Sequence, residues 1–228
     1  MPTDTLTRQV LATGVSLLAD IAHPEEAQGL VLFAHGSGSS RLSPRNRAVA
    51  AELQRAGLAT VLVDLLTPEE ERLDARSGRL RFDINLLAAR LIALTDWLRQ
   101  DPAGAGLGVG LFGASTGAAA ALVAAAARPD AVRAVVSRGG RPDLAGEFLR
   151  LVHQPTLLIV GENDATVVQF NRRAMALLSG HTRLEIVPGA SHLFEEPGAL
   201  EMVARLAREW FVAHLTRPSE SQPASARH

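Results

Sequence analysis

Residues Gly110–Leu122 read GLFGASTGAAAAL, in which Ser115 lies two positions from a glycine on each side. Apolar residues precede the serine and a run of alanines follows it. This order predicts a strand, a tight turn and a helix, which together make a nucleophile elbow that exposes a serine hydroxyl at the end of a strand. Such a strained turn tolerates only small neighbours, and Gly113 and Gly117 supply them. The alternative is that Ser115 only caps the helix that follows.

The rest of the chain repeats the order of strand and helix. Short runs rich in Val, Leu and Ile alternate with longer helical patterns, which predicts an α/β fold around a mostly parallel sheet with helices on both faces. The predicted strands are 15–21, 30–34, 60–64, 108–112, 134–137, 156–160 and 183–187. The predicted helices are 44–56, 85–99, 115–127, 167–178 and 198–214. No helix separates the first two strands, so we expect a hairpin that makes the amino-terminal edge antiparallel.

The chain is expected to form one domain. A length of 228 residues suits a single core, which we place in residues 1–215. Residues 216–228 are polar and lack an apolar face, which predicts a disordered tail. The charged segment 67–83, with Glu69–Glu71 near its start, favours a solvated loop over a mobile flap.

The composition excludes several kinds of chemistry. The chain contains no Lys and no Cys, so it cannot carry a phosphate-binding lysine loop, a Schiff-base lysine, a thiolate nucleophile or a cysteine zinc site. A formal net charge of -1 gives no field that would attract nucleic acid or an anionic membrane. The amino-terminal residues lack the apolar core of a secretory signal, and a cytoplasmic protein with a small-molecule partner is expected. The oligomeric state stays open, a homodimer included.

Gly108, Gly110 and Gly113 also match the GxGxxG pattern of dinucleotide-binding proteins. That pattern must follow a strand and open a helix. Here the apolar residues of the strand lie inside the motif. An acidic residue at the end of a second strand, about 20 residues further on, is also missing. The nucleotide interpretation is therefore disfavoured.

A nucleophilic serine needs a histidine base and a carboxylate that orients it, in the chain order Ser, Asp or Glu, His. Of the histidines after Ser115, only His192 lies in a loop directly after a predicted strand. The others have ordinary interpretations as surface or capping residues: His153, His181, His214 and His228. Asp164 follows the strand 156–160 and is the favoured carboxylate, although it could instead cap the next helix. Glu162 and Asp143 are the alternatives.

An oxyanion hole requires the amide after the nucleophile and a second amide from the loop after an earlier strand. The residue after the serine is Thr116. The loop that follows strand 30–34 reads HGSGSS, in which Ser37 is the favoured second donor and Gly36 the alternative.

With these parts in place, the sequence resembles the α/β-hydrolases, and among them the small dienelactone-hydrolase-like group, some members of which are joined to phosphoribosyltransferase domains. The resemblance covers most of Leu30–Trp210, through FAHGSGSSRLSPRNR, VLVDLLTPEEE, GLFGASTGAAAAL, VVSRGGRPDLA, LLIVGENDATV and LEIVPGASHLFEEPGAL. It implies an α/β-hydrolase fold. It also implies a triad and two oxyanion donors at matching positions: Ser115, Asp164 and His192, with Ser37 and Thr116.

The resemblance implies a hydrolase that needs no cofactor and no metal. Dienelactone hydrolases themselves use a cysteine nucleophile, which this chain lacks, so a general carboxylesterase acting on small esters is the favoured function. The segment after strand 134–137 is too short for a large lid, which favours short acyl groups. The alternatives are a thioesterase, lactonase or acyltransferase with the same triad, and a binding protein of hydrolase fold with little turnover.

Arginines gather near the predicted site. Arg138 and Arg141 lie in the loop after strand 134–137, while Arg41, Arg45 and Arg47 follow the oxyanion loop. A guanidinium suits a carboxylate or phosphate on a substrate, so Arg138 and Arg141 are candidate substrate-binding residues. The alternative is that these arginines are solvated surface residues.

Overall fold

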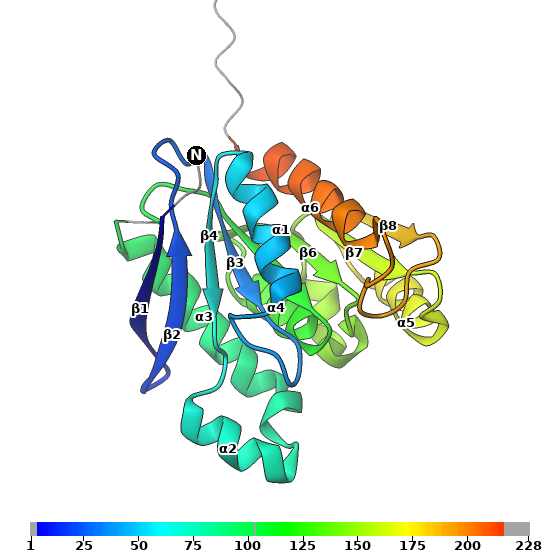
Figure 1. Cartoon of the computed structure of the whole chain (residues 1–228). Coiled ribbons are helices and arrows are strands. Elements are labelled where there is room, and N and C mark those ends of the chain that lie inside the picture. Colours follow the sequence, from blue (N-terminus) through cyan, green and yellow to red (C-terminus); the bar gives the residue numbers. More distant parts are fainter. Residues whose placement is uncertain (1–3, 103, 217–228) are drawn as a thin grey trace, which may run out of the picture.

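The computed structural model describes residues 4–102 and 104–216, in which eight strands form one sheet in the order β1-β2-β4-β3-β5-β6-β7-β8 (Figure 1). Strands β3 to β8 run parallel, whereas β2 is antiparallel to both of its neighbours, β1 and β4. The strands are β1 (Thr5–Ala12), β2 (Val15–Ala22), β3 (Gly29–Ala34), β4 (Leu58–Val63), β5 (Val109–Ala114), β6 (Val132–Arg138), β7 (Thr156–Gly161) and β8 (Thr182–Val187). The predicted mostly parallel sheet with an antiparallel amino-terminal edge is confirmed.

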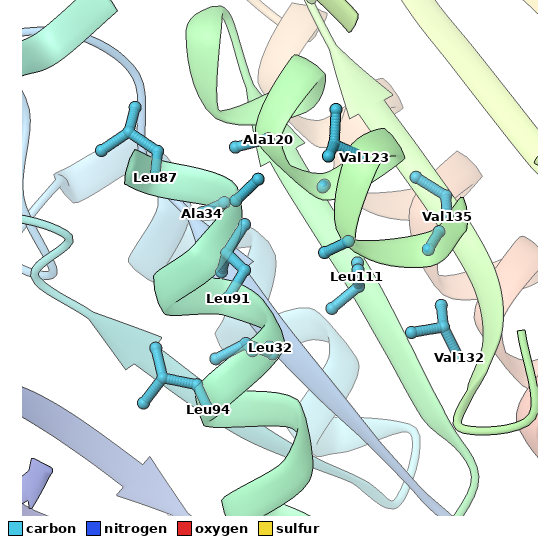
Figure 2. Close-up of a cluster of buried hydrophobic side chains, with 14 of the residues drawn as sticks. Leu32, Ala34, Leu87, Leu91, Leu94, Leu111, Ala120, Val123, Val132 and Val135 are labelled. Atoms are coloured by element: carbon cyan, nitrogen blue, oxygen red, sulfur yellow. The ribbon is translucent and has the colours of Figure 1, made fainter. Parts of the chain in front are cut away.

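Helices cover both faces of the sheet (Figure 1). They are α1 (Pro44–Arg55), α2 (Pro68–Ser77), α3 (Ile84–Gln100), α4 (Thr116–Ala127), α5 (Ala165–Met175) and α6 (Ala199–Leu215), with the 3₁₀ segments η1 (Leu80–Phe82) and η2 (Pro142–Leu151). Helices α1 and α6 pack on one face in one apolar cluster, and α3, α4 and η2 pack on the other. Figure 2 shows Leu87, Leu91 and Leu94 of α3 in the same buried cluster as the sheet residues Leu32 and Leu111. The site is thereby built on a sheet that is buried on both sides.

The amino-terminal edge differs in detail from the expectation. The hairpin joins β1 and β2 through Thr13 and Gly14, both at positive φ, and β2 then pairs with β4. The predicted hairpin between the strands 15–21 and 30–34 is wrong, because β3 lies between β4 and β5 in the interior of the sheet.

The charged segment 67–83 is a helix and a 3₁₀ turn rather than the expected solvated loop. Thr67 begins α2 with a capping box, in which its hydroxyl accepts from the amide of Glu70 and the Glu70 carboxylate accepts from the amide of Thr67. Asp74 is buried, accepts from the amide of Leu80 at 2.7 Å, and pairs with Arg81. Helix α2 extends beyond the carboxyl ends of the parallel strands, where the site lies (Figure 1).

Residues 217–228 of the predicted tail lie outside the described residues. Within 4–102 and 104–216, no helix is both long enough and apolar enough to cross a membrane.

Candidate active site

Ser115 lies between β5 and α4 with φ 50° and ψ −119°, a conformation that few residues other than glycine adopt. Such strain costs about 1–3 kcal/mol and needs support from the surroundings. The support comes from the end of β6 and the loop after it: the Ser115 amide donates to the carbonyl of Arg138 at 3.2 Å, and the Ser115 carbonyl accepts from the amide of Arg141 at 3.1 Å. Among the described residues, the Ser115 side chain makes no capping hydrogen bond, so its hydroxyl is not used to begin α4.

The two glycines of the motif are required by close packing. A Cβ on Gly113 would collide with the backbone of Ala118, and one on Gly117 would collide with the carbonyl oxygens of Ala34 and His35. The turn between β5 and α4 therefore packs tightly against the start of its own helix and against the end of β3.

His192 and Asp164 are brought together by the loops after β8 and β7. The Nδ1 of His192 lies 2.6 Å from Oδ2 of Asp164, and the Asp164 side chain makes no capping bond to α5 within the described chain. A hydrogen bond at Nδ1 leaves Nε2 as the free ring nitrogen. Gly139, next to the elbow, lies close to the His192 ring, since a Cβ built on it would be 3.5 Å from Cε1.

The two residues that precede Asp164, Glu162 and Asn163, also connect the loops after β7 and β8. Glu162 accepts from the amide of Gly189 at 2.8 Å, while the side chain of Asn163 donates to the carbonyl of Gly189 at 2.8 Å. The amide of Asn163 also donates to the carbonyl of Ala190 at 2.9 Å. These bonds fix the loop that carries His192 relative to the loop that carries Asp164.

The alternative carboxylates and histidines lie elsewhere. Glu162 is used as just described, and Asp143 binds Arg141. His181 stacks on Trp210, and His214 contacts the same ring edge-on. His153 precedes β7, and His228 is outside the described residues.

The loop after β3 contains the candidate oxyanion donors. The carbonyl of Gly36 accepts from the amide of Ser39 at 3.2 Å, and Gly38 has φ +68°, which makes residues 36–39 a β-turn. This turn bond does not use the amide of Ser37. A Cβ on Gly36 would lie 3.0 Å from the Ser115 Cβ, so the turn lies directly against the elbow. Thr116 is the first residue of α4, where amides lack an acceptor within the helix.

Sequence reasoning gave no role to His35 or Asp64, which hold this loop in place. The Nε2 of His35 accepts from the amide of Leu65 at 3.0 Å, so its Nδ1 carries the proton and donates to the carbonyl of Gly36 at 2.9 Å. Burial lowers the pKa of His35, which favours this neutral form. Asp64 accepts from the amide and the guanidinium of Arg41 at 2.7 and 2.6 Å. The available signal was the position of Asp64 at the end of the predicted strand 60–64.

A cavity of about 540 Å³ opens beside the oxyanion loop. Its walls come from the loop after β3, the start of α1, the segment α2–η1 and the start of α4. Gly36, Ser37 and Thr116 line it next to the elbow, and the charged side chains are Arg45, Glu71, Asp74 and Arg81. Burial, followed by the charge of Asp64, raises the pKa of Glu71.

The two candidate substrate-binding arginines are in different situations. Arg141 forms a two-point ion pair with Asp143 at 2.8 and 2.7 Å and lies over the ring of Phe170. Arg138, the last residue of β6, is buried, and its Nε and Nη1 have no hydrogen-bond partner among the described residues.

No group of three or more His, Asp or Glu side chains suited to a metal ion occurs in residues 4–102 and 104–216.

The model of the dienelactone hydrolase family matches residues 17–214. A protein known in two strains of Mycobacterium tuberculosis, CDC 1551 / Oshkosh and H37Rv, and named "Putative phosphoribosyl transferase", is 59% identical over 213 residues. The match covers 93% of this chain and 47% of that protein, so the chain spans about half the length of these curated relatives.

Solved structures agree with the family match. The dienelactone hydrolase from Anabaena variabilis ATCC 29413 superposes with a TM-score of 0.92 at 58% identity, covering 94% of this chain and 100% of that one. Est1E from Butyrivibrio proteoclasticus, with a TM-score of 0.76 at 16% identity over 91% of this chain and 98% of its own, shares the fold. The fold is that of an α/β-hydrolase, and the chain belongs to the dienelactone hydrolase family.

Proposed function

We propose that the protein is a serine hydrolase that cleaves small carboxylic esters through an acyl-enzyme. Ser115 is the nucleophile, His192 the general base and Asp164 the residue that orients the histidine. The observation that carries this proposal is the 2.6 Å contact between His192 and Asp164 at the edge of the sheet where the strained Ser115 also lies. In the chain order Ser, Asp, His, this is the arrangement of an α/β-hydrolase triad.

The proposed reaction has two halves. The Oγ of Ser115 attacks the ester carbonyl carbon while Nε2 of His192 takes its proton, and the negative charge on the carbonyl oxygen is bound by the amides of Ser37 and Thr116. The C–O bond then breaks as His192 gives the proton to the departing alcohol. A water molecule, deprotonated by the same histidine, releases the acid and restores the serine.

Short acyl groups are the proposed substrates. The segment after β6 consists of η2 and short turns, and the walls of the cavity beside the oxyanion loop carry four serines and four charged side chains together with three leucines. Such a wall suits a small or polar acid better than a long hydrocarbon chain.

Lactone hydrolysis is the second candidate, favoured by the membership of the dienelactone hydrolase family. A lactone is a cyclic ester, so the same residues perform the same steps and the departing alcohol stays attached to the acyl group. Another structural relative, described as a dienelactone hydrolase-like promiscuous phosphotriesterase, shares the fold at a TM-score of 0.76 and 16% identity, covering 94% of this chain and 100% of that one.

Hydrolysis of 4-nitrophenyl acetate, butyrate and octanoate by the wild type and by Ser115→Ala tests the proposal. We expect turnover of the acetate and butyrate, little of the octanoate, and a loss of several orders of magnitude in the variant. A serine-reactive phosphonate should label the wild type at Ser115. Equal activity of the two proteins, or absence of labelling together with absence of turnover, would contradict the proposal and favour a binding protein.

A further inference from the structure

Asn171 lies in the interior of α5 and is 0% exposed. Its Nδ2 donates to two carbonyl oxygens: that of Val167 at 2.8 Å, one turn earlier in the same helix, and that of Gly140 at 2.9 Å, in the loop after β6. Asparagine is a poor helix former, and fully buried helix positions are normally apolar. The polar side chain is explained by its bond to Gly140, which an apolar residue could not make.

The residues on either side of Gly140 contact the proposed triad. The amide of Arg141 donates to the carbonyl of Ser115 at 3.1 Å. A Cβ built on Gly139 would lie 3.5 Å from Cε1 of His192 and 3.2 Å from the carbonyl oxygen of the same residue. The segment 139–141 is therefore in contact with both Ser115 and His192.

Gly140 is also enclosed by the element that begins at the elbow. A Cβ on Gly140 would collide with Oγ of Ser137 and with Cβ of Ala118, which lies in the first turn of α4. The loop after β6 is thus held by close packing against the start of α4 and by the hydrogen bond from Asn171 of α5.

Helix α5 carries the third residue of the proposed triad at its beginning. Asp164 directly precedes α5, and its carbonyl accepts from the amide of Val168 at 2.9 Å, so it belongs to the first turn. Asn171 lies about two helical turns further along. One helix therefore joins the residue that contacts His192 to the residue that holds the loop beside Ser115.

We propose that Asn171 is a positioning residue for the reaction. By binding Gly140, it fixes the loop beside Ser115 to the helix that begins at Asp164, and it thereby sets the position of Ser115 relative to His192. The inference rests on the proposed serine hydrolase function. Residues 139–141 are not among the described residues that line the cavity, so loss of this bond should lower kcat and leave KM nearly unchanged.

Asn171→Leu tests this role, because leucine has the same branching but no donor for Gly140. We expect kcat for 4-nitrophenyl acetate to fall about 10- to 100-fold with KM within about 2-fold of the wild type, since small misplacements of reacting groups are costly. Gln154→Met is the matched control. Gln154 is also buried, its Nε2 donates to the carbonyl of Ala125 at 2.8 Å, and it precedes β7, at the opposite end of this strand from Asp164. The control should lose a similar amount of thermal stability and keep kcat within about 2-fold.

Asn171→Asp supplies a readout that a purely structural role would not move. A protonated carboxyl can donate to the carbonyl of Gly140, whereas an ionised carboxylate can only accept. Burial raises the pKa of such a carboxyl. The kcat of this variant relative to the wild type should therefore fall from about pH 6 to about pH 8, toward the ratio for Asn171→Leu, which should not depend on pH. The aspartate variant also carries the test if the leucine variant does not fold.

Amide hydrogen exchange measures the positioning without turnover. The amides of Ser115 and Arg141 should exchange at least about 10-fold faster in Asn171→Leu than in the wild type, and at the wild-type rate in Gln154→Met. If the wild type cleaves esters and Asn171→Leu keeps the kcat of the control, the inference is overturned and the hydrolase proposal stands. If the wild type cleaves no ester, the hydrolase proposal is overturned. Faster exchange in Asn171→Leu would then still support its hold on the elbow, and unchanged exchange would overturn it.

Discussion

The Nδ1 of His192 and Oδ2 of Asp164 lie 2.6 Å apart although 28 residues separate them in the chain. The contact joins the loops after two adjacent parallel strands, β7 and β8. In the proposed triad, a carboxylate in this position holds one tautomer of the imidazole and stabilises the imidazolium that would form in the reaction.

Asp164→Asn should therefore lower kcat by about 10³- to 10⁴-fold with little change in stability, because the amide is the same size but favours the wrong tautomer. Ester hydrolysis under saturating substrate measures the effect. Asp143→Asn is the control, since Asp143 is bound to Arg141 instead. An equal loss in both variants would show that Asp164 is not the orienting carboxylate.

Glu162 should act by positioning the loop of His192 rather than by proton chemistry. Glu162→Ala removes the acceptor for the Gly189 amide, and we expect kcat to fall about 3- to 30-fold with KM nearly unchanged, the size of one hydrogen bond. Glu162→Gln keeps an oxygen acceptor and should recover most of the activity. If Glu162→Gln were as inactive as Asp164→Asn, Glu162 would be the triad carboxylate.

The sequence predicted the sheet well where strands are buried on both faces. The seven predicted strands match the observed ones to within two residues at each end, and five of them, β3 to β7, are buried parallel strands that read as continuous apolar runs. Strand β1 was missed because six of its eight residues are exposed and its pairing with β2 defines it. Helix α2 was missed because its ten residues, PEEERLDARS, lack an apolar face, although the capping box of Thr67 and Glu70 was a readable signal.

The positions of the candidate triad residues could be predicted from the order of the strands. The burial and ion pairing of Arg138 and Arg141 could not. Parallel strands end at one edge, so residues directly after β5, β7 and β8 were expected to meet there, and the contact of Asp164 with His192 agrees. The two arginines differ because the side chain of Arg138 is buried without a partner for its Nε and Nη1 among the described residues, whereas Arg141 is bound by Asp143. The sequence shows only two arginines three positions apart, and this does not reveal which of them is buried and which is paired.

Gly117→Ala should destabilise the fold strongly. The added Cβ meets the carbonyl oxygens of Ala34 and His35, which belong to the end of β3 and cannot move without disturbing the sheet. We expect the free energy of unfolding in urea to fall by about 3 kcal/mol or more. Gly57→Ala is the matched control: Gly57 has φ +77° but open space around its Cβ position, so it should lose only about 1 kcal/mol of conformational strain. Equal losses would show that close packing at Gly117 is unimportant.

His35 should make the free energy of unfolding decrease as the pH is lowered below neutrality. Burial lowers its pKa below the ordinary value of 6.5, because the folded protein uses the neutral ring to accept from Leu65 and donate to Gly36. As the pH falls below 6.5, the unfolded chain takes up the proton first, so this contribution is complete above 6.5 and is lost progressively below it. One such group changes the free energy of unfolding by at most about 1.4 kcal/mol per pH unit.

Urea unfolding at pH 5, 6 and 7 measures this slope. His35→Asn and His35→Gln, which cannot take up a proton, should reduce it relative to the wild type. His214 also has a pKa lowered by burial and by the charge of His181, so it contributes a slope of the same sign, and this contribution should persist in both His35 variants. His214→Gln should therefore lower the slope independently of His35, and the two reductions should add because the residues lie at opposite ends of the parallel strands. An unchanged slope in both His35 variants would mean that the folded ring takes up a proton as readily as the unfolded one and that the carbonyl of Gly36 is held in some other way.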